Sequence, residues 1–171
     1  MDGPRYCTVC GHLLEVAQIE NRQRSVCRSC GHIHYVNPIP SVVALIENDG
    51  AILLVKRAVE PAKGDWCLPG GFIETGETIA DAVIREVMEE TGLECRPLEV
   101  WDVCSDLGGF YGDILVVCYR AQSLGGTLRA GDDAAALDFF HKDSVPRLAF
   151  RCHARFLEKF WRQKVAFQPH R

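Results

Sequence analysis

The sequence lacks any apolar run long enough to cross a membrane. Its longest apolar runs are VVALI, AILLV and ILVVCY, and each has only the length of a β-strand. The N-terminal stretch MDGPRYCTVC also lacks the basic start and apolar core of a secretory signal. We therefore expect a cytoplasmic protein without a membrane partner.

An excess of positive charge is also missing. The chain has 19 lysine and arginine residues against 23 aspartates and glutamates, for a formal net charge of −4. This balance gives no broad basic surface, so charge does not support nucleic-acid binding, although a local basic groove stays open. With 47% hydrophobic and 25% charged residues, the 171 residues suit one globular domain with a small appended module.

The cysteines do not fit a disulfide framework, because nine is an odd number and the chain is long for such a scaffold. Five of them are scattered among apolar neighbours, which predicts small buried side chains: Cys67, Cys95, Cys104, Cys118 and Cys152. No histidine or other base motif accompanies any of the five, so a catalytic cysteine is not indicated.

The other four cysteines, Cys7, Cys10, Cys27 and Cys30, form two CxxC pairs separated by sixteen residues. Each pair can place two thiolates on one tetrahedral ion, and a closed four-sulfur set favours zinc over iron. A thioredoxin-like redox pair and simple burial are the alternatives, but neither accounts for two matching knuckles. We predict a structural zinc ribbon over residues 1–36.

The rest of the chain predicts mixed strands and two helices, an order that favours a layered α/β sandwich over a regular βαβ array. The expected strands are residues 41–48, 51–58, 98–106, 113–122 and 136–142, with a hairpin turn at NDG joining the first two. The glycine- and proline-rich stretch 66–77 is expected to be a loop. A helix over 150–163 would place its aromatic residues in the core: Phe156, Phe160 and Trp161.

The other predicted helix covers residues 78–91. Thr78 suits the N-cap, with Asp81 three residues on as its partner, and Gly92 suits the C-terminal end. Its core-facing side is expected to carry three aliphatic residues: Val83, Ile84 and Val87.

This helix carries a dense stripe of carboxylates. At about 100° per residue, Glu90 lies about 40° from Glu86, and Glu89 lies about 60° to the other side. The loop before the helix adds Glu74 and Glu77 beside a glycine pair. Because hard divalent cations are held by a few carboxylates together with substrate phosphates, we predict a Mg²⁺ or Mn²⁺ site for a phosphate-containing substrate.

A plain acidic surface helix with ion pairs is the alternative. Glu77, Arg85 and Glu89 could form some pairs. Helical spacing places no cation after Glu86 or Glu90, however, which favours the metal site.

The same residues match a known family pattern. Gly71, Glu77 and the run REVMEETGL reproduce every fixed position of the Nudix box, from Gly71 to Leu93. The chain therefore resembles Nudix hydrolases, most clearly in the box and more loosely over residues 40–165. The resemblance implies an α/β/α sandwich with a mixed sheet over residues 37–171. It also implies hydrolysis of a nucleoside diphosphate linked to another moiety.

The resemblance also implies roles for matching positions. Glu86 and Glu90 would be the principal metal ligands, and Glu89 would be a further ligand or the catalytic base. The carbonyl of Gly70 would complete the site. The structural positions of the box would be Gly71, Glu77, Arg85 and Gly92, with Arg85 and Glu77 paired.

The catalytic base stays open, because some family members take it from a later loop. Asp132 and Asp133 are the candidates there. The bound metal ions would neutralise the pyrophosphate and lower the pKa of a water molecule.

A zinc ribbon before a Nudix domain resembles two groups. NADH pyrophosphatases, which also remove NAD caps from RNA, carry SQPWPFPxS after the box, where this chain has WDVCSDLGGFYGD. The short Nudix proteins similar to plant FAD and ADP-ribose pyrophosphatases share the Asn37-Pro38 junction and the LAF element at 148–150. The second resemblance implies FAD, ADP-ribose or a similar ADP-containing dinucleotide as substrate. NADH or NAD-cap hydrolysis and a nucleotide-sensing regulatory protein are the alternatives.

An ADP-containing substrate would need an aromatic or apolar slot for adenine. The candidates are Phe72, Phe110, Tyr111 and Phe150, each of which could equally be ordinary packing. The intact carboxylate set favours an enzyme over a sensor. Nudix dimers are common, and the ribbon or the first strands could supply the interface of a homodimer.

Overall fold

The computed structural model describes residues 4–131 and 133–166. The chain divides into two compact units, Met1–Pro38 and Ile39–Arg171. In the described part of the chain, no helix combines the length and the apolar character that a membrane span needs.

The first unit is a small antiparallel sheet with little apolar core. Its strands are β1 (Leu14–Ile19), β2 (Arg22–Cys27) and β3 (Ile33–His34), in the order β1-β2-β3. Among its described residues only Cys7, Val26 and Cys27 are buried. So small a core makes the unit dependent on another source of stability, and its cysteines are the residues placed to provide it.

The second unit is built on a seven-stranded mixed sheet in which β10, β5, β4, β9 and β8 follow one another. The two short strands β6 and β7 pair with β5 and β4, and only the β4–β9 pair is parallel. The strands are β4 (Ile39–Asn48), β5 (Ala51–Arg57), β6 (Trp66–Cys67), β7 (Gly70–Phe72), β8 (Leu93–Gly109), β9 (Gly112–Gly126) and β10 (Ala134–Phe140). The helices are α1 (Ile79–Thr91), the 3₁₀ turn η1 (Lys142–Ser144) and α2 (Arg151–Ala166).

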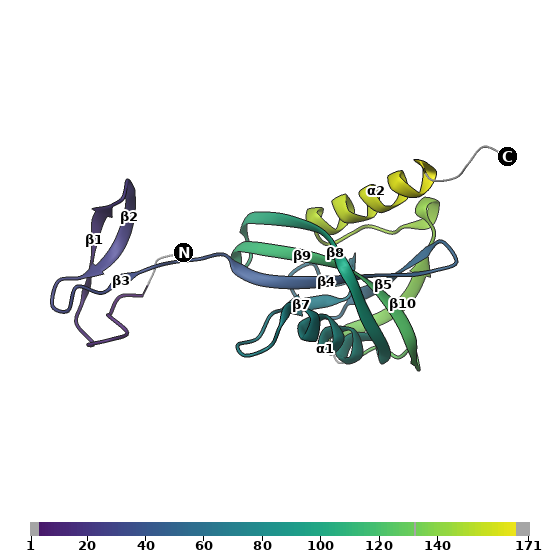
Figure 1. The fold of residues 1–171 in the computed structure, drawn as a ribbon, viewed down its shortest axis with the longest axis horizontal. Helices are drawn as coiled ribbons and strands as arrows, with labels where there is room; N and C mark the ends of the chain where they lie inside the picture. The colour runs from purple at the N-terminus through teal and green to yellow at the C-terminus, as the bar shows by residue number, and fades with distance from the viewer. Residues whose placement is uncertain (1–3, 132, 167–171) are drawn as a thin grey trace. The chain divides into compact units, whose positions relative to one another are not determined.

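The sheet lies between α1 and α2 (Figure 1), which confirms the α/β/α sandwich with a mixed sheet. Strand β4 shows how the two faces are filled, because its side chains alternate between them. Val43 and Leu45 belong to the core cluster that includes the aromatic residues of α2. Val42, Ala44 and Ile46 belong to the cluster that includes the apolar face of α1.

The hairpin expected at NDG is present as the β4–β5 pair, in which Glu47 faces Ile52 and Asn48 faces Ala51. The stretch 66–77 is not only a loop, because it contains β6 and β7. These strands are two and three residues long, too short to show an alternating pattern in sequence. Strands β8 and β9 run longer than expected at both ends.

The end signals of α1 are confirmed. Thr78 and Asp81 form a reciprocal capping box, and Gly92 takes the left-handed conformation, with its N–H donating to the carbonyl of Met88. The side facing the sheet is centred on Val83 and Val87, as expected.

One residue of the expected core face of α1 is placed wrongly. Ile84 is 41% exposed, and Ala82 completes the buried face instead. Ile84 lies about 100° round the helix from Val83, on the side away from Ala82.

Helix α2 is fixed to the sheet by aromatic packing and by one buried polar contact. Phe156, Phe160 and Trp161 are buried, as expected. His153 is also buried, and its Nδ1 accepts a hydrogen bond of 3.0 Å from the N–H of Leu68, between β6 and β7. Burial lowers the pKa of His153 to about 3, and the nearby charge of Arg57 adds to the effect, so the imidazole is neutral.

Replacing Gly92 by alanine should destabilise the second unit. A Cβ there would lie 2.6 Å from the carbonyl oxygen of Thr127, in addition to the strain of a positive φ. Gly76→Ala is the matched control, because Gly76 also has a positive φ but open space around its Cβ position. We expect Gly76→Ala to cost about 1–2 kcal/mol of unfolding free energy. Gly92→Ala should cost about 1–3 kcal/mol more.

All three tryptophans lie in the second unit, so urea unfolding followed by tryptophan fluorescence measures both variants. Equal losses in the two variants would contradict the close contact with Thr127.

The buried neutral histidine predicts a pH dependence of stability. Because the pKa of His153 is about 3 in the folded state and has its ordinary value of 6.5 in the unfolded state, only the unfolded chain takes up this proton between those values. The free energy of unfolding should therefore fall with decreasing pH in this window. His153 contributes up to about 1.4 kcal/mol per pH unit.

The variant His153→Asn keeps an acceptor for Leu68 but cannot titrate there. As pH falls from about 6.5 to 4, the wild type should lose unfolding free energy through His153 and the variant should not. The difference in unfolding free energy between the two proteins, measured by urea unfolding, should therefore shrink. Measurements near pH 8 give the baseline difference between the two proteins. Parallel pH profiles would show that His153 is not held neutral.

Candidate active site

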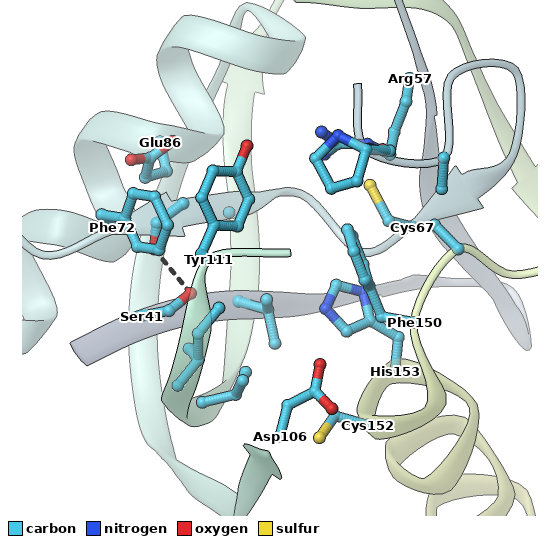
Figure 2. A pocket seen from close by; sticks show the side chains of 18 of the residues that line it. Ser41, Arg57, Cys67, Phe72, Glu86, Asp106, Tyr111, Phe150, Cys152 and His153 are labelled. Carbon is cyan, nitrogen blue, oxygen red and sulfur yellow. Dashed lines mark hydrogen bonds between the residues drawn. The ribbon is translucent and has the colours of Figure 1, made fainter. Parts of the chain in front are cut away.

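The second unit has a cavity of about 510 Å³ that is lined by residues of the sheet and of both helices. Its walls come from β4, β5, β6, β7, α1, the β8–β9 hairpin and the start of α2, as Figure 2 shows for part of the set. The volume lies in the range of ligand pockets. It therefore suits a small molecule with several chemically different parts.

The carboxylate stripe of α1 forms one wall of this cavity. Glu86, Glu89 and Glu90 all line it, and the same three residues line an adjoining hollow with Arg129 and Asp133. The three glutamates were expected to share one face of the helix, and in the structure they line the same two hollows.

The glycine pair before α1 brings β7 close to these carboxylates. The N–H of Gly70 donates a hydrogen bond of 2.9 Å to Oε2 of Glu90. A Cβ on Gly71 would lie 2.5 Å from Oε1 of Glu86, so a side chain there would push this carboxylate out of its present position. Ser41 on β4 fixes the pair further, because its Oγ donates to the carbonyl of Gly71 over 2.9 Å.

The electrostatics of the stripe favour a cation. Burial raises the pKa of Glu90 to about 7, against the lowering effect of the Gly70 N–H. Burial also raises the pKa of Glu86, and Arg85 opposes that shift. Arg85 supplies only one positive charge to the three carboxylates of the stripe, and a divalent cation would provide more. The carboxylate oxygens do not lie close enough together to form a ready ligand cluster. Among the described residues, only the four N-terminal cysteines form such a cluster.

Arg85 lies at the centre of an ion-pair network beside the stripe. It donates to both carboxylate oxygens of Glu77, at 2.7 and 3.0 Å, and to the carbonyl of Phe72 at 3.0 Å. It also contacts Glu86 at 2.8 Å and Glu89 at 3.2 Å. The pair with Glu86 joins adjacent residues, which is why helical spacing did not suggest it. Arg85 thus ties the loop before α1 to the carboxylate stripe.

The aromatic residues proposed for an adenine slot line the same cavity. Phe72 and Tyr111 pack edge to face with ring centroids 5.2 Å apart, and Phe110 adds a similar contact to Tyr111 at 5.0 Å. Phe150 lies with the start of α2, next to the ring of His153. The structure therefore brings carboxylates and aromatic rings from distant parts of the sequence to one cavity.

Several lining residues carry no sequence signal for this site. Arg57 follows a buried strand, and its guanidinium lies 5.2 Å from the centre of the Phe150 ring. Asp106 comes from β8, and His153 comes from α2. These three residues line the same cavity as the stripe because the β8–β9 hairpin and α2 fold towards the end of β5.

The candidates for the catalytic base are placed differently. Glu89 and Asp133 line the same two hollows, so either can reach a substrate bound there. Asp132 lies outside the described residues.

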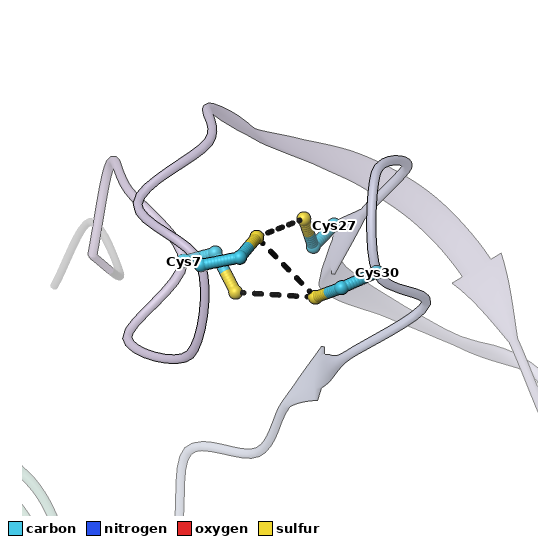
Figure 3. A group of neighbouring side chains, drawn as sticks. Cys7, Cys27 and Cys30 are labelled. Atoms are coloured by element: carbon cyan, nitrogen blue, oxygen red, sulfur yellow. Dashed lines mark hydrogen bonds between the residues drawn. The ribbon is translucent and has the colours of Figure 1, made fainter.

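The four N-terminal cysteines converge in the first unit (Figure 3). Cys10 Sγ lies 3.4 Å from the sulfurs of Cys27 and Cys30, and Cys7 Sγ lies 3.7 Å from that of Cys30. Sulfurs at the corners of a tetrahedron with zinc–sulfur bonds of about 2.3 Å are about 3.8 Å apart, whereas a disulfide needs about 2.0 Å. The donor set therefore fits a tetrahedral ion.

The two knuckles have the same backbone turn. Gly11 and Gly31 both have a positive φ, and their N–H groups donate to the carbonyls of Cys7 and Cys27. The backbone N–H of Cys30 lowers the pKa of the Cys27 thiol to about 6. The pKa of Cys10 is instead raised to about 12, because the lowering effect of the His12 backbone is outweighed by hydrogen bonds with the Cys27 and Cys30 thiols. Elsewhere the scattered cysteines are buried as expected, apart from the half-buried Cys104.

The sequence matches two family models. The one described as "NUDIX domain" covers residues 37–160, and the one described as "Nudix N-terminal" covers residues 5–36. An ADP-ribose pyrophosphatase of Methanocaldococcus jannaschii is 40% identical over 131 residues, which are 76% of this chain and 77% of that protein. NAD-capped RNA hydrolase NudC of Klebsiella pneumoniae subsp. pneumoniae is 34% identical over 144 residues, 84% of this chain. This chain spans 54% of the length of that NudC protein.

The fold matches solved structures as well. A crystal structure of a Nudix hydrolase from Nitrosomonas europaea superposes with a TM-score of 0.85 and 28% identity, covering 97% of this chain and 95% of that one. The complete box, the sandwich that presents its carboxylates and these matches all point the same way. The chain belongs to the Nudix family and is a Nudix hydrolase.

Proposed function

We propose that the protein hydrolyses the pyrophosphate bond of an ADP-containing substrate such as ADP-ribose or FAD. The observation that carries the proposal is the single cavity in which the carboxylate stripe and a group of aromatic side chains face the same space. One wall suits a metal-bound diphosphate, and the aromatic groups suit a planar base. The similarity to a relative named ADP-ribose pyrophosphatase supports this substrate class.

In this proposal the carboxylates of Glu86, Glu89 and Glu90, with the carbonyl of Gly70, hold Mg²⁺ or Mn²⁺. The bound ions would neutralise the diphosphate and make a water molecule more acidic. Glu89 or Asp133 accepts the proton of the attacking water, since both face the two hollows beside the stripe. The N–H of Gly70 orients the carboxylate of Glu90.

The second candidate is hydrolysis of NADH or of NAD caps on RNA. The similarity to proteins named NAD-capped RNA hydrolase NudC supports it, and the match to one of them covers 84% of this chain. The missing SQPWPFPxS sequence after the box argues against it. A sensor without catalysis would not need the three glutamates that line the cavity.

We further propose that residues 1–36 form a zinc ribbon and that residues 37–171 form the hydrolase domain. The convergence of four thiols in a unit with few buried residues supports a structural role for zinc. A cytoplasmic location and a homodimer would agree with this assignment, and the size of the assembled protein in solution tests the latter.

Glu89→Gln and Glu90→Gln should each lower kcat for the best substrate at least about 100-fold with Mg²⁺ or Mn²⁺, because each removes a charge from the stripe. The fold should persist, because an amide oxygen at position 90 can still accept from Gly70. Phosphate release from a panel of ADP-ribose, FAD, NADH and NAD-capped RNA measures the effect and selects the substrate.

Glu94→Gln is the matched control, because Glu94 is exposed on β8 and does not line the cavity. Its activity should equal that of the wild type. Full activity of the Glu89 and Glu90 variants would contradict the proposed site. Tight binding of a nucleotide by the wild type without any hydrolysis would favour a sensor.

Purified wild-type protein should contain about one zinc ion per chain, because four thiolates close one tetrahedral site. Cys10→Ala should lose most of this zinc, whereas Cys95→Ala, a buried cysteine of the second unit, should retain it. Elemental analysis after dialysis against a weak chelator measures the content. Iron instead of zinc, or full zinc in Cys10→Ala, would contradict the assignment.

A further inference from the structure

The start of α2 places a buried hydrogen-bonding group in the wall of the active-site cavity. His153 is only 5% exposed, yet it lines the cavity, and Figure 2 shows its ring among the lining side chains. Its Nδ1 is occupied by the N–H of Leu68 at 3.0 Å. Among the described residues, no group bonds to its Nε2. Nε2 is not among the fully enclosed side-chain atoms without a partner, so it keeps accessible surface and is open to a bond with a ligand in the cavity.

The contact with Leu68 fixes which nitrogen carries the proton. Because a backbone N–H can only donate, Nδ1 must be the acceptor, and the neutral ring then carries its hydrogen on Nε2. The neutral state follows from burial, which lowers the pKa of His153 far below the physiological range. His153 therefore offers the cavity one neutral N–H donor in a fixed direction.

The surroundings of this donor suit a flat, uncharged ring. The side chains of Val43, Ile114 and Val116 line the same cavity, and the ring of Phe150 lies 5.0 Å from that of His153 at an angle of 54°. Apolar and aromatic surfaces accept a heteroaromatic ring, and the guanidinium of Arg57, 5.2 Å from the centre of the Phe150 ring, offers a flat cation against which such a ring can also stack. A single neutral donor among them selects a ring with an acceptor atom at its edge.

We propose that His153 determines specificity by donating its Nε2–H to a ring nitrogen of the substrate's adenine base. The inference rests on the proposed function, since it takes ADP as the constant part of the substrate. It adds a residue outside the Nudix box to the binding site and separates two tasks. The stripe on α1 serves the diphosphate, and His153 on α2 reads the base.

Two substitutions separate the two nitrogens of the ring. His153→Asn places an oxygen near the position of Nδ1, so it keeps an acceptor for Leu68 but loses the donor. His153→Gln carries an amide donor near the position of Nε2 but loses the contact with Leu68. With ADP-ribose, we expect His153→Asn to raise KM about 3- to 10-fold and to leave kcat within about twofold. His153→Gln should raise KM less, although its melting temperature should be lower than that of His153→Asn.

Substrate analogues test the same bond without changing the protein. ADP-ribose analogues in which adenine N1, N3 or N7 is replaced by C–H each remove one acceptor. One of the three should raise the wild-type KM about 3- to 10-fold. The same analogue should raise the KM of His153→Asn no further, because the donor is already gone.

The outcomes distinguish this inference from the proposed function. If the wild type hydrolyses no ADP-containing dinucleotide with Mg²⁺ or Mn²⁺, both fail. If it hydrolyses ADP-ribose but none of the three analogues changes KM, only the role of His153 fails. The role of His153 would also be overturned if His153→Asn lowered only kcat, or if it raised KM for FAD but not for ADP-ribose. The same holds if the variant and the analogue raised KM independently, so that the two increases multiplied in His153→Asn. Tryptophan fluorescence melting confirms that each variant is folded.

Discussion

The close contact between strand β7 and helix α1 is the constraint on which the active site depends. The N–H of Gly70 bonds to the carboxylate of Glu90, and a Cβ on Gly71 would lie 2.5 Å from the carboxylate of Glu86. At Gly70 a Cβ would also collide with the backbone of Val42, because β7 is packed against β4. The two glycines therefore allow the carboxylate-bearing helix α1 to lie close to the central sheet.

The sandwich keeps stability and chemistry in separate places. Strand β4 supplies alternate side chains to two core clusters, one towards each helix, and these clusters are almost free of polar groups. Charged residues gather instead where the strands end and α1, α2 and the β8–β9 hairpin meet the cavity. Because the core on both faces has few polar groups, the partly buried carboxylates can be tolerated at one edge without loosening the fold.

The sequence predicted what depends on local pattern. The capping box, the terminal Gly92 and the carboxylate stripe follow from short-range spacing, so α1 was predicted almost completely. The layered α/β architecture was also predictable, but β6 and β7 were missed because they exist only through pairing with β5 and β4. His153 could not be recognised for a similar reason. It bonds to Leu68, 85 positions away, and nothing near either residue signals the other.

Arg85 gives the acidic stripe its own counter-ion. It already neutralises part of the charge of Glu86 and Glu89, while its contacts with Glu77 and Phe72 keep it in place. A divalent cation that took these carboxylates as ligands would compete with Arg85 for Glu86 and Glu89. The contacts of Arg85 with Glu77 and Phe72 would not compete with such a cation, because neither residue belongs to the stripe. Without any divalent cation, two of the three glutamates of the stripe thus already have a basic partner.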